Sequence, residues 1–332
     1  MRPRFSVRFN NDVAPGRFAR LAALAEESGF DQIWVSNDLF WQSATVLLAA
    51  AAKTTSRIEL GVGVFNPVSM HAAEIAMVAA SLADLTDGRF RLGLGAGADR
   101  FLAWAGLAPD PPVTRTEKAI REVRALLAGE SPAGWDGEGR MRIPVAPVPI
   151  YLGAMGPAML RLAGRIADGA LPLLFPPSHY RVAAAQIAGG AAGAGRLPES
   201  IDVAACIWCS IDHDAERAKN ALAAKIAYYG PSFSPHLLEP AGLSAADLEP
   251  IGHALAAGDS GRAIGLVTPR MLSLGVAGGA DEAIAACAEL VRDGARHISF
   301  GPPLGPDPEA ALRVLAAEVL PALDIVLTQE SP

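Results

Sequence analysis

Residues 57–64, with the sequence RIELGVGV, form a short apolar strand, and the chain after them decides the fold. Apolar side chains recur at helical spacing over residues 71–85, and Asp87-Gly88 ends that helix because glycine turns left-handed readily. Residues 90–97, FRLGLGAG, are a second apolar strand that finishes in glycines. Two parallel strands joined by a helix place their carboxyl ends together, where such folds bind ligands. The glycines at both strand ends therefore predict a flat ligand that lies against exposed backbone.

The same alternation extends over the rest of the chain and gives eight strand-like segments, each followed by a helical one. Strands are expected at residues 5–9, 31–36, 57–64, 90–97, 148–152, 168–174, 201–211 and 296–300. Eight such units predict an α/β fold of the (β/α)8 TIM barrel type, with insertions after strands 4 and 7. A doubly wound open sheet is the alternative, because counting strands does not distinguish a closed sheet from an open one.

We expect one barrel domain over residues 1–325 and a tail at residues 326–332. The two insertion regions, 98–148 and 230–271, are expected near the barrel mouth. The first contains a helix near residues 114–128 and a polar, hairpin-like loop at 129–142. The second is irregular apart from a helical piece near residues 248–257.

Composition sets further bounds. The chain has 332 residues, of which 51% are hydrophobic and 19% charged, so a large buried core is expected. A net charge of −7 argues against binding to nucleic acid or to an anionic membrane, and leaves a small-molecule substrate as the expected partner. No apolar run is long enough to cross a bilayer, and the first residues run directly into a strand without a signal peptide. These features predict a cytoplasmic protein.

Three cysteines, Cys206, Cys209 and Cys287, argue against a disulfide framework. Cys206 and Cys209 have C-x-x-C spacing, but they fall on a predicted strand, where side chains three residues apart face opposite sides. We therefore expect buried core thiols and no metal site.

In a barrel, the residues directly after each strand line one mouth. Asn37 and Asp38 follow the second strand and either face a reactive ring or cap the next helix. His71 is expected to cap a helix, and His297 to be structural at the opposite end of the barrel. Trp41 either walls a pocket or packs under a loop.

The other strand ends are rich in glycine and lack a nucleophile paired with a base. They suit a planar cofactor whose anionic tail is bound by backbone N–H groups. Residues 153–157, GAMGP, end a strand and open a helix, so their free N–H groups could hold a phosphate. A plain strand-to-helix turn explains the same residues. The glycines of residues 93–97 lack the spacing of a dinucleotide fingerprint, which makes a Rossmann dehydrogenase the weakest hypothesis.

Five segments in order resemble the bacterial-luciferase-like superfamily, and most of all its deazaflavin-dependent branch, which includes methylene-tetrahydromethanopterin reductases. The segments are residues 22–38, 57–67 with His71, 82–97, 148–168 and 298–307. The resemblance implies a barrel that binds the deazaflavin coenzyme F-420, or alternatively FMN, at its carboxyl mouth. A homodimer is usual in this superfamily.

The resemblance also assigns roles to residues. It implies a non-prolyl cis peptide at Gly63–Val64 that props the central ring, with Asn66 close by. The backbone at Gly95 and Gly97, together with that of the turn Gly153, Ala154, Met155 and Gly156, would hold the ribityl-phosphate part.

Two positions depart from the sugar-phosphate dehydrogenases of this branch. Asn37-Asp38 stands where they have an Asp-His pair, and Ala98 stands where they have a Glu. A reductase that delivers hydride fits better, because hydride transfer needs positioning more than a strong base. Asp38 is the candidate for any proton transfer.

The leading hypothesis is therefore an oxidoreductase that transfers a hydride between reduced coenzyme F-420 and an unidentified organic substrate, at a C=N, C=C or CH–OH group. An FMN-dependent two-component monooxygenase of the same fold is the first alternative. A non-catalytic flavin-binding relative is the second.

Overall fold

Eight parallel strands close into a barrel in the computed structural model of the protein, which describes residues 3–97, 99–108, 111–233 and 235–329. The barrel strands are β1 (Arg4–Phe9), β2 (Gln32–Val35), β3 (Glu59–Phe65), β4 (Phe90–Leu94), β5 (Ile150–Ala154), β6 (Gly169–Leu174), β7 (Asp202–Ile211) and β9 (His297–Leu304), and a further strand, β8 (Val276–Gly278), pairs with β7 outside the barrel. β1 pairs with both β2 and β9, and β7 pairs with both β6 and β9, so the sheet closes on itself. The barrel is confirmed, and the open doubly wound sheet is wrong.

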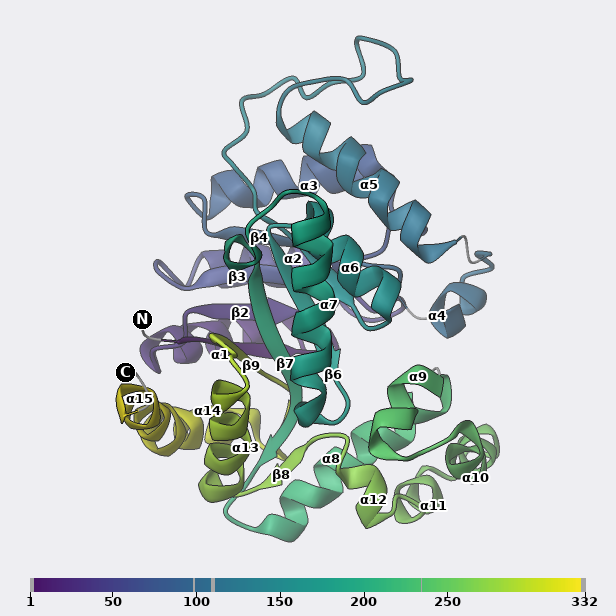
Figure 1. Cartoon of the computed structure of the whole chain (residues 1–332), viewed down its shortest axis with the longest axis vertical. Coiled ribbons are helices and arrows are strands. Elements are labelled where there is room, and N and C mark those ends of the chain that lie inside the picture. Colours follow the sequence, from purple (N-terminus) through teal and green to yellow (C-terminus); the bar gives the residue numbers. More distant parts are fainter. Residues whose placement is uncertain (1–2, 98, 109–110, 234, 330–332) are drawn as a thin grey trace.

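Helices surround the barrel on its outer face (Figure 1). They are α1 (Pro15–Glu27), α2 (Ala44–Ala52), α3 (Ala72–Leu85), α5 (Pro112–Leu127), α6 (Pro157–Ile166), α7 (Tyr180–Gly193), α8 (Ala215–Tyr229), α13 (Ala280–Arg292), α14 (Pro308–Val314) and α15 (Leu320–Gln329). Each follows from amphipathic spacing that turns an apolar face toward the sheet. The tail expected from residue 326 begins inside α15, and residues 330–332 lie outside the described part of the chain.

The structure corrects the expectations for the inserted segments. After β4, α4 (Asp99–Trp104) and α5 are followed by residues 129–142, which form turns and no strand, so the hairpin-like description is wrong. After α8, the segment that we expected to be irregular is mostly helical, with α9 (Pro235–Leu238), α10 (Ala245–Ala256), α11 (Ser260–Gly265) and α12 (Pro269–Leu272). A capping box between Ser244 and Asp247 starts α10.

Most strand boundaries differ from the expectation by one to four residues, and one strand was not expected. β8 was missed because three residues carry no periodicity, and it pairs with the end of β7 beyond the barrel. β9 continues past the expected residue 300 because its register with β7 runs on to the pair Ser210 and Leu304.

The interior of the barrel differs in character from the layer under the helices. On β1, Phe5, Val7 and Phe9 belong to the large hydrophobic cluster between sheet and helices. Ser6 and Arg8 point the other way, because successive side chains of a strand face opposite sides. The barrel interior is therefore partly polar.

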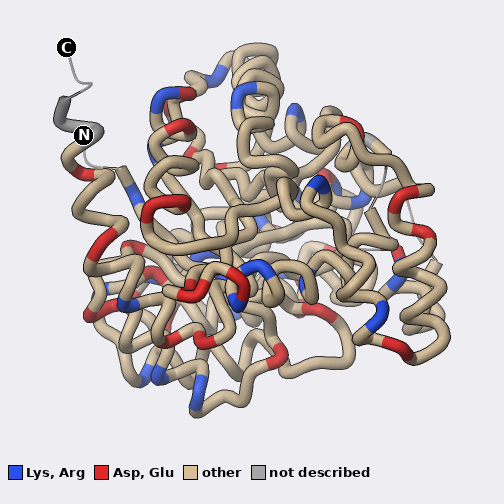
Figure 2. Tube along the Cα trace, turned by 90° about the horizontal axis from the view of Figure 1, so that it is seen from below, with Lys and Arg blue, Asp and Glu red and all other residues tan. Residues whose placement is uncertain are grey.

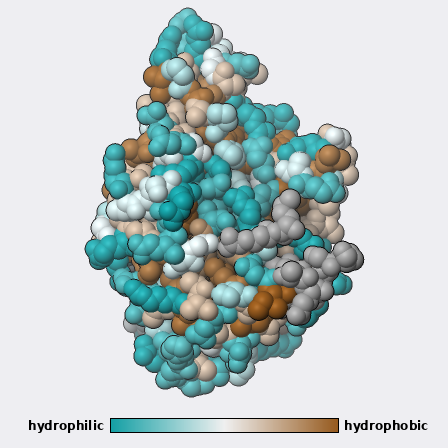
Figure 3. Space-filling view, turned by 90° about the vertical axis from the view of Figure 1, so that its left-hand side faces the viewer, coloured by the Kyte–Doolittle hydropathy of each residue, from teal (hydrophilic) through white to brown (hydrophobic). Residues whose placement is uncertain are grey.

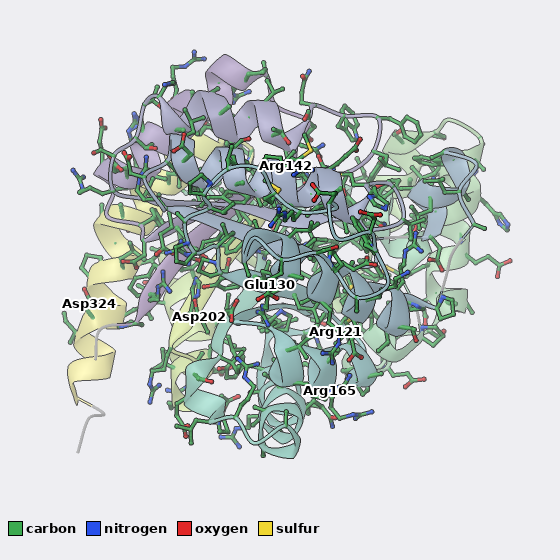
Figure 4. All side chains as sticks on the ribbon, turned by 90° about the horizontal axis from the view of Figure 1, so that it is seen from above. Arg121, Glu130, Arg142, Arg165, Asp202 and Asp324 are labelled. Carbon is green, nitrogen blue, oxygen red and sulfur yellow. The ribbon has the colours of Figure 1, made fainter. Side chains whose placement is uncertain are left out.

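Ion pairs fasten some helices to each other. Arg121 of α5 and Arg165 of α6 lie side by side in Figure 4, and each donates to Glu117, at 2.7 and 2.8 Å. The hydrogen bond from Arg121 is the main reason that the pKa of Glu117 is lowered. α5 is thereby held against the C-terminal end of α6.

The surface carries no face of a single charge sign in the view of Figure 2, where acidic and basic positions alternate along the trace. In Figure 3, apolar residues on the displayed face form small groups among hydrophilic ones. In the described part of the chain, no helix has both the length and the apolar character that crossing a membrane requires.

Candidate functional site

The end of β3 is irregular, at the position where the resemblance placed a cis peptide. The register between β3 and β4 shifts between Val62 and Phe65, and the peptide bond between Gly63 and Val64 is cis. The cis peptide is thus confirmed. Val64 is partly exposed and lies over the interior cluster that contains Trp34 and Tyr151.

Val64 extends across the neighbouring strands and occupies the space that Gly95 and Gly153 leave free. A Cβ atom at Gly95 or Gly153 would come within 2.8 or 2.9 Å of the methyl groups of Val64, whereas one at Gly93 would first meet the carbonyl oxygen of Val62 at 2.1 Å. Real Cβ atoms essentially never approach closer than 3.0 Å. The expectation of bare backbone at these strand ends is therefore wrong, because Val64 covers it and forms part of the floor of the mouth.

Asn66 fastens the loop after β3 to the loop after β4. Its Nδ2 donates to the carbonyl of Ala96 at 2.6 Å, and its Oδ1 accepts from the N–H of Val68 at 2.8 Å. A Cβ at Gly97, whose φ is +69°, would lie 2.4 Å from that Nδ2 atom. Asn66 shapes the mouth through these backbone contacts. Ala98, the next residue, lies outside the described part of the chain.

The turn from β5 into α6 presents free N–H groups at the mouth. Gly156 precedes the helix without a side-chain cap, and Pro157 occupies the first helical position. Met155 is 40% exposed, whereas Ala154 is buried in the strand. An uncapped helix start is an anion-binding feature, because its first N–H groups lack partners within the helix.

The pair after β2 divides into one structural and one mouth residue. Asn37 accepts a hydrogen bond from the N–H of Ala44 at 3.2 Å, so it caps the start of α2. The carboxylate of Asp38 accepts from the hydroxyl of Tyr229 at 3.0 Å and from that of Ser36 at 3.3 Å. Burial raises the pKa of Tyr229, and the charge of Asp38 raises it further, so this hydroxyl remains a neutral donor.

Lys225 joins this cluster, which the sequence interpretation had missed. Its Nζ donates to Oδ1 of Asn10 at 2.8 Å and lies 3.9 Å from the centre of the Tyr229 ring. Only 8% of Lys225 is exposed. Burial lowers its pKa to about 7, although the charges of Asp38 and Asp12 act in the opposite direction.

Arg8 lies below Lys225 inside the barrel. Its Nη2 donates to the carbonyl of Ile207 at 2.6 Å, and its guanidinium lies against Gly301, where a Cβ would come within 2.2 Å of Nη2. Nε is buried and has no hydrogen-bond partner. Burial lowers the pKa of Arg8. Among the described residues, neither Arg8 nor Lys225 has a carboxylate within ion-pair distance.

The sequence alone contained a pattern that could have indicated Arg8 and Lys225. Arg8 breaks an apolar strand at a position that alternation assigns to the barrel interior. Lys225 falls on the buried face of α8 between Leu222 and Ile226. A single charged residue on an apolar helix face is a signal of this kind.

The opposite end of the barrel is closed by a polar network around Asp202, which is labelled in Figure 4. Asp202 accepts hydrogen bonds from Arg4 at 3.0 Å and from the hydroxyl of Tyr151 at 2.7 Å, and contacts Nδ1 of His297 at 3.0 Å. Burial by itself would raise the pKa of Asp202. His297, Tyr151 and Arg4 outweigh burial and hold that pKa well below its usual range. His297 is 1% exposed and structural, as the sequence predicted.

The remaining candidates have plain roles. His71 caps α3 by accepting the N–H of Ala73 at 3.3 Å, and Trp41 is 53% exposed. Cys206 and Cys209 are free buried thiols in different clusters, on opposite faces of β7 as predicted. In the described ranges, no group of three His, Cys, Asp or Glu side chains could hold a metal ion.

Comparisons of sequence and structure show which known proteins this chain is similar to. The family model described as luciferase-like monooxygenase matches residues 3–297. The 5,10-methylenetetrahydromethanopterin reductase of Methanolobus tindarius is 36% identical over 324 residues, which are 95% of this chain and 99% of that protein.

Two further proteins are similar. The solved structure of the coenzyme F-420-dependent tetrahydromethanopterin reductase of Methanopyrus kandleri superposes with a TM-score of 0.86 at 30% identity, and covers 97% of this chain and 99% of that one. The F-420-dependent glucose-6-phosphate dehydrogenase of Nakamurella multipartita is 33% identical over 225 residues, which are 61% of this chain and 66% of that protein.

Proposed function

This chain belongs to the luciferase-like monooxygenase family, and we propose that it is a coenzyme F-420-dependent oxidoreductase that transfers a hydride between the deazaflavin and an organic substrate. The proposal is supported by similarity over nearly the whole chain to reductases whose names include coenzyme F-420 or methylenetetrahydromethanopterin. It is also supported by a mouth built from hydrogen-bond donors and aromatic rings instead of a nucleophile and its base.

The residues of the mouth fit the cofactor. Val64 offers an apolar, propped surface on which the planar ring would rest, at the ends of β4 and β5. The uncapped start of α6, after Gly156, would receive the phosphate through its N–H groups. A deazaflavin supplies two-electron hydride chemistry, and the protein contributes binding and orientation.

The single observation that carries the proposal is the position of Val64 over Gly95 and Gly153. Two glycines on separate strands make room for this valine at a conformational-entropy cost, so the surface that it forms is a built feature of the mouth. Tyr229 and Ser36 both donate to Oδ2 of Asp38, so Oδ1, which has no hydrogen-bond partner among the described residues, is the atom that would act on a proton.

Titration of the purified protein with oxidised coenzyme F-420, and separately with FMN, tests the proposal. Trp208 and Trp34, which lie inside the barrel, report binding through their fluorescence. We expect a dissociation constant of about 1 µM or below for the deazaflavin and binding of FMN at least roughly tenfold weaker. The reverse preference would favour the FMN monooxygenase, and binding of neither would contradict both enzyme hypotheses.

A further inference from the structure

Two cations in the barrel, the buried Lys225 and the partly buried Arg8, lack the partners that such groups normally have. Charged side chains are almost never buried unless they are paired, since removing a charge from water is costly. Arg8 has a buried Nε with no hydrogen-bond partner, and Lys225 is 8% exposed and bonded only to the neutral amide of Asn10. Because neither cation contacts a carboxylate among the described residues, an anion from outside the protein would supply the missing partner for both.

Arg8 and Lys225 meet at one side of the mouth. Arg8 and Asn10 are two residues apart at the end of β1, and Lys225 reaches Asn10 from α8. The charge of Arg8 lies close enough to lower the pKa of Lys225. Arg8 also lies within electrostatic range of Cys206, which packs in the same cluster as Val64. The two cations therefore lie on the side of the barrel that β1, β9 and β7 form.

Both cations keep donors available. Nη2 of Arg8 is engaged by the carbonyl of Ile207, but Nη1 has no partner in the described part of the chain and is not enclosed. Nζ of Lys225 carries three protons, and Asn10 accepts one of them. The N–H groups of Nη1 and an ammonium group on the same side of the mouth match the two oxygens of a carboxylate.

We propose that Arg8, Lys225 and Asn10 form a subsite that binds a carboxylate group of the substrate. The inference rests on the proposed function, because it names the substrate class of that same mouth: an organic monoanion with an apolar body. Trp208 and Tyr229 supply the apolar surface, with Nζ of Lys225 at 5.4 and 3.9 Å from their ring centres.

A carboxylate suits the site better than a doubly charged phosphate. Asp12 and Asp38 face the same region, and their charges act on Lys225. They offset part of the positive charge of the two cations, so the site favours a single negative charge. Arg8 also offers only Nη1, because Nη2 is bound and Nε is enclosed.

The test uses benzoate as the probe, with benzamide as its uncharged match, and follows tryptophan fluorescence and calorimetry of the cofactor-free protein. Benzoate is expected to bind at least roughly tenfold more tightly than benzamide. Arg8→Met and Lys225→Met should each remove this preference, while Arg8→Lys should recover part of it. Deazaflavin binding, measured in parallel, separates failure of this subsite from failure of the proposed function.

Thermal unfolding distinguishes this role from a structural one. If Arg8 serves an external anion, Arg8→Met leaves the melting temperature unchanged or higher, because an incompletely satisfied buried charge is removed. A lower melting temperature with benzoate preference retained would mean that Arg8 only supports the barrel, and would overturn the proposal.

The pH dependence supplies a second readout. Lys225 is the group whose pKa is lowered to about 7. The charged or titratable groups around it are Arg8, Asp12, Asp38 and Tyr229. Benzoate stays ionised above about pH 6, so its binding should weaken as Lys225 loses its proton between about pH 6 and about pH 9. In Lys225→Met the affinity should be flat over this range. Equal binding of benzoate and benzamide at every pH would also overturn the proposal.

Discussion

A Gly153→Ala variant is expected to bind coenzyme F-420 roughly 5- to 150-fold more weakly than the wild-type protein. The new Cβ would lie 2.9 Å from Cγ1 of Val64, which is closer than real Cβ atoms come. Val64 is β-branched and also borders Gly93 and Gly95. Rotating its side chain away from the new Cβ atom would therefore bring a methyl group closer to one of these neighbours. Overpacking of this kind costs about 1–3 kcal/mol, and here it would displace the floor on which the ring rests. Fluorescence titration measures the effect.

Two controls make this prediction specific. The double variant Val64→Ala with Gly153→Ala removes the methyl groups that clash, so it should bind more tightly than Gly153→Ala alone. Gly189→Ala lies in α7, where a Cβ meets nothing within 4 Å, and should leave binding unchanged. If the double variant binds no better than Gly153→Ala, the clash with Val64 is not the cause.

An Asp202→Asn variant is expected to lose about 3–5 kcal/mol of unfolding free energy at pH 7. Its carboxylate is the shared partner of His297, Arg4 and the hydroxyl of Tyr151 at the closed end of the barrel. The amide keeps the shape but removes the negative charge, so Arg4 retains only Glu59 as an ionic partner. Urea unfolding followed by circular dichroism measures the loss. Deazaflavin binding, measured under conditions in which the variant remains folded, should be unchanged, since this network lies away from the mouth.

The pH dependence of that loss follows from the direction of the shift. The pKa of Asp202 is lower in the folded protein than in the unfolded chain. The contribution of Asp202 to the free energy of unfolding is therefore complete above its pKa in the unfolded chain, near 4. It disappears as the pH falls toward the pKa of Asp202 in the folded protein. The difference between wild type and Asp202→Asn should be constant from about pH 5 to pH 7 and shrink below about pH 4. A difference that grows on acidification would contradict this assignment.

Much of the mouth was predictable because the position of a strand end is a local property. The order of strands placed Asp38, Val64, Gly95 and Met155 on one rim, and the resemblance located the cis peptide at Gly63–Val64. The capping alternatives for Asn37 and His71 were also visible, because a cap involves residues near in sequence. Of the helices between α8 and β8, only α10 was expected, as the helical piece near residues 248–257, and its start was placed too late although Ser244 and Asp247 carried a capping signal.

What the sequence alone determined is the alternation of apolar strands and helices, hence the barrel, its mouth and the residues at each strand end, since periodicity depends only on neighbouring residues. Only the tertiary structure decided what fills the space beside Gly95 and Gly153, and which side chains meet across the barrel. The hydrogen bond between Asn10 and Lys225 joins residues 215 positions apart. Such a contact depends on how the sheet closes and how α8 lies against it, so no local pattern of residues contains it.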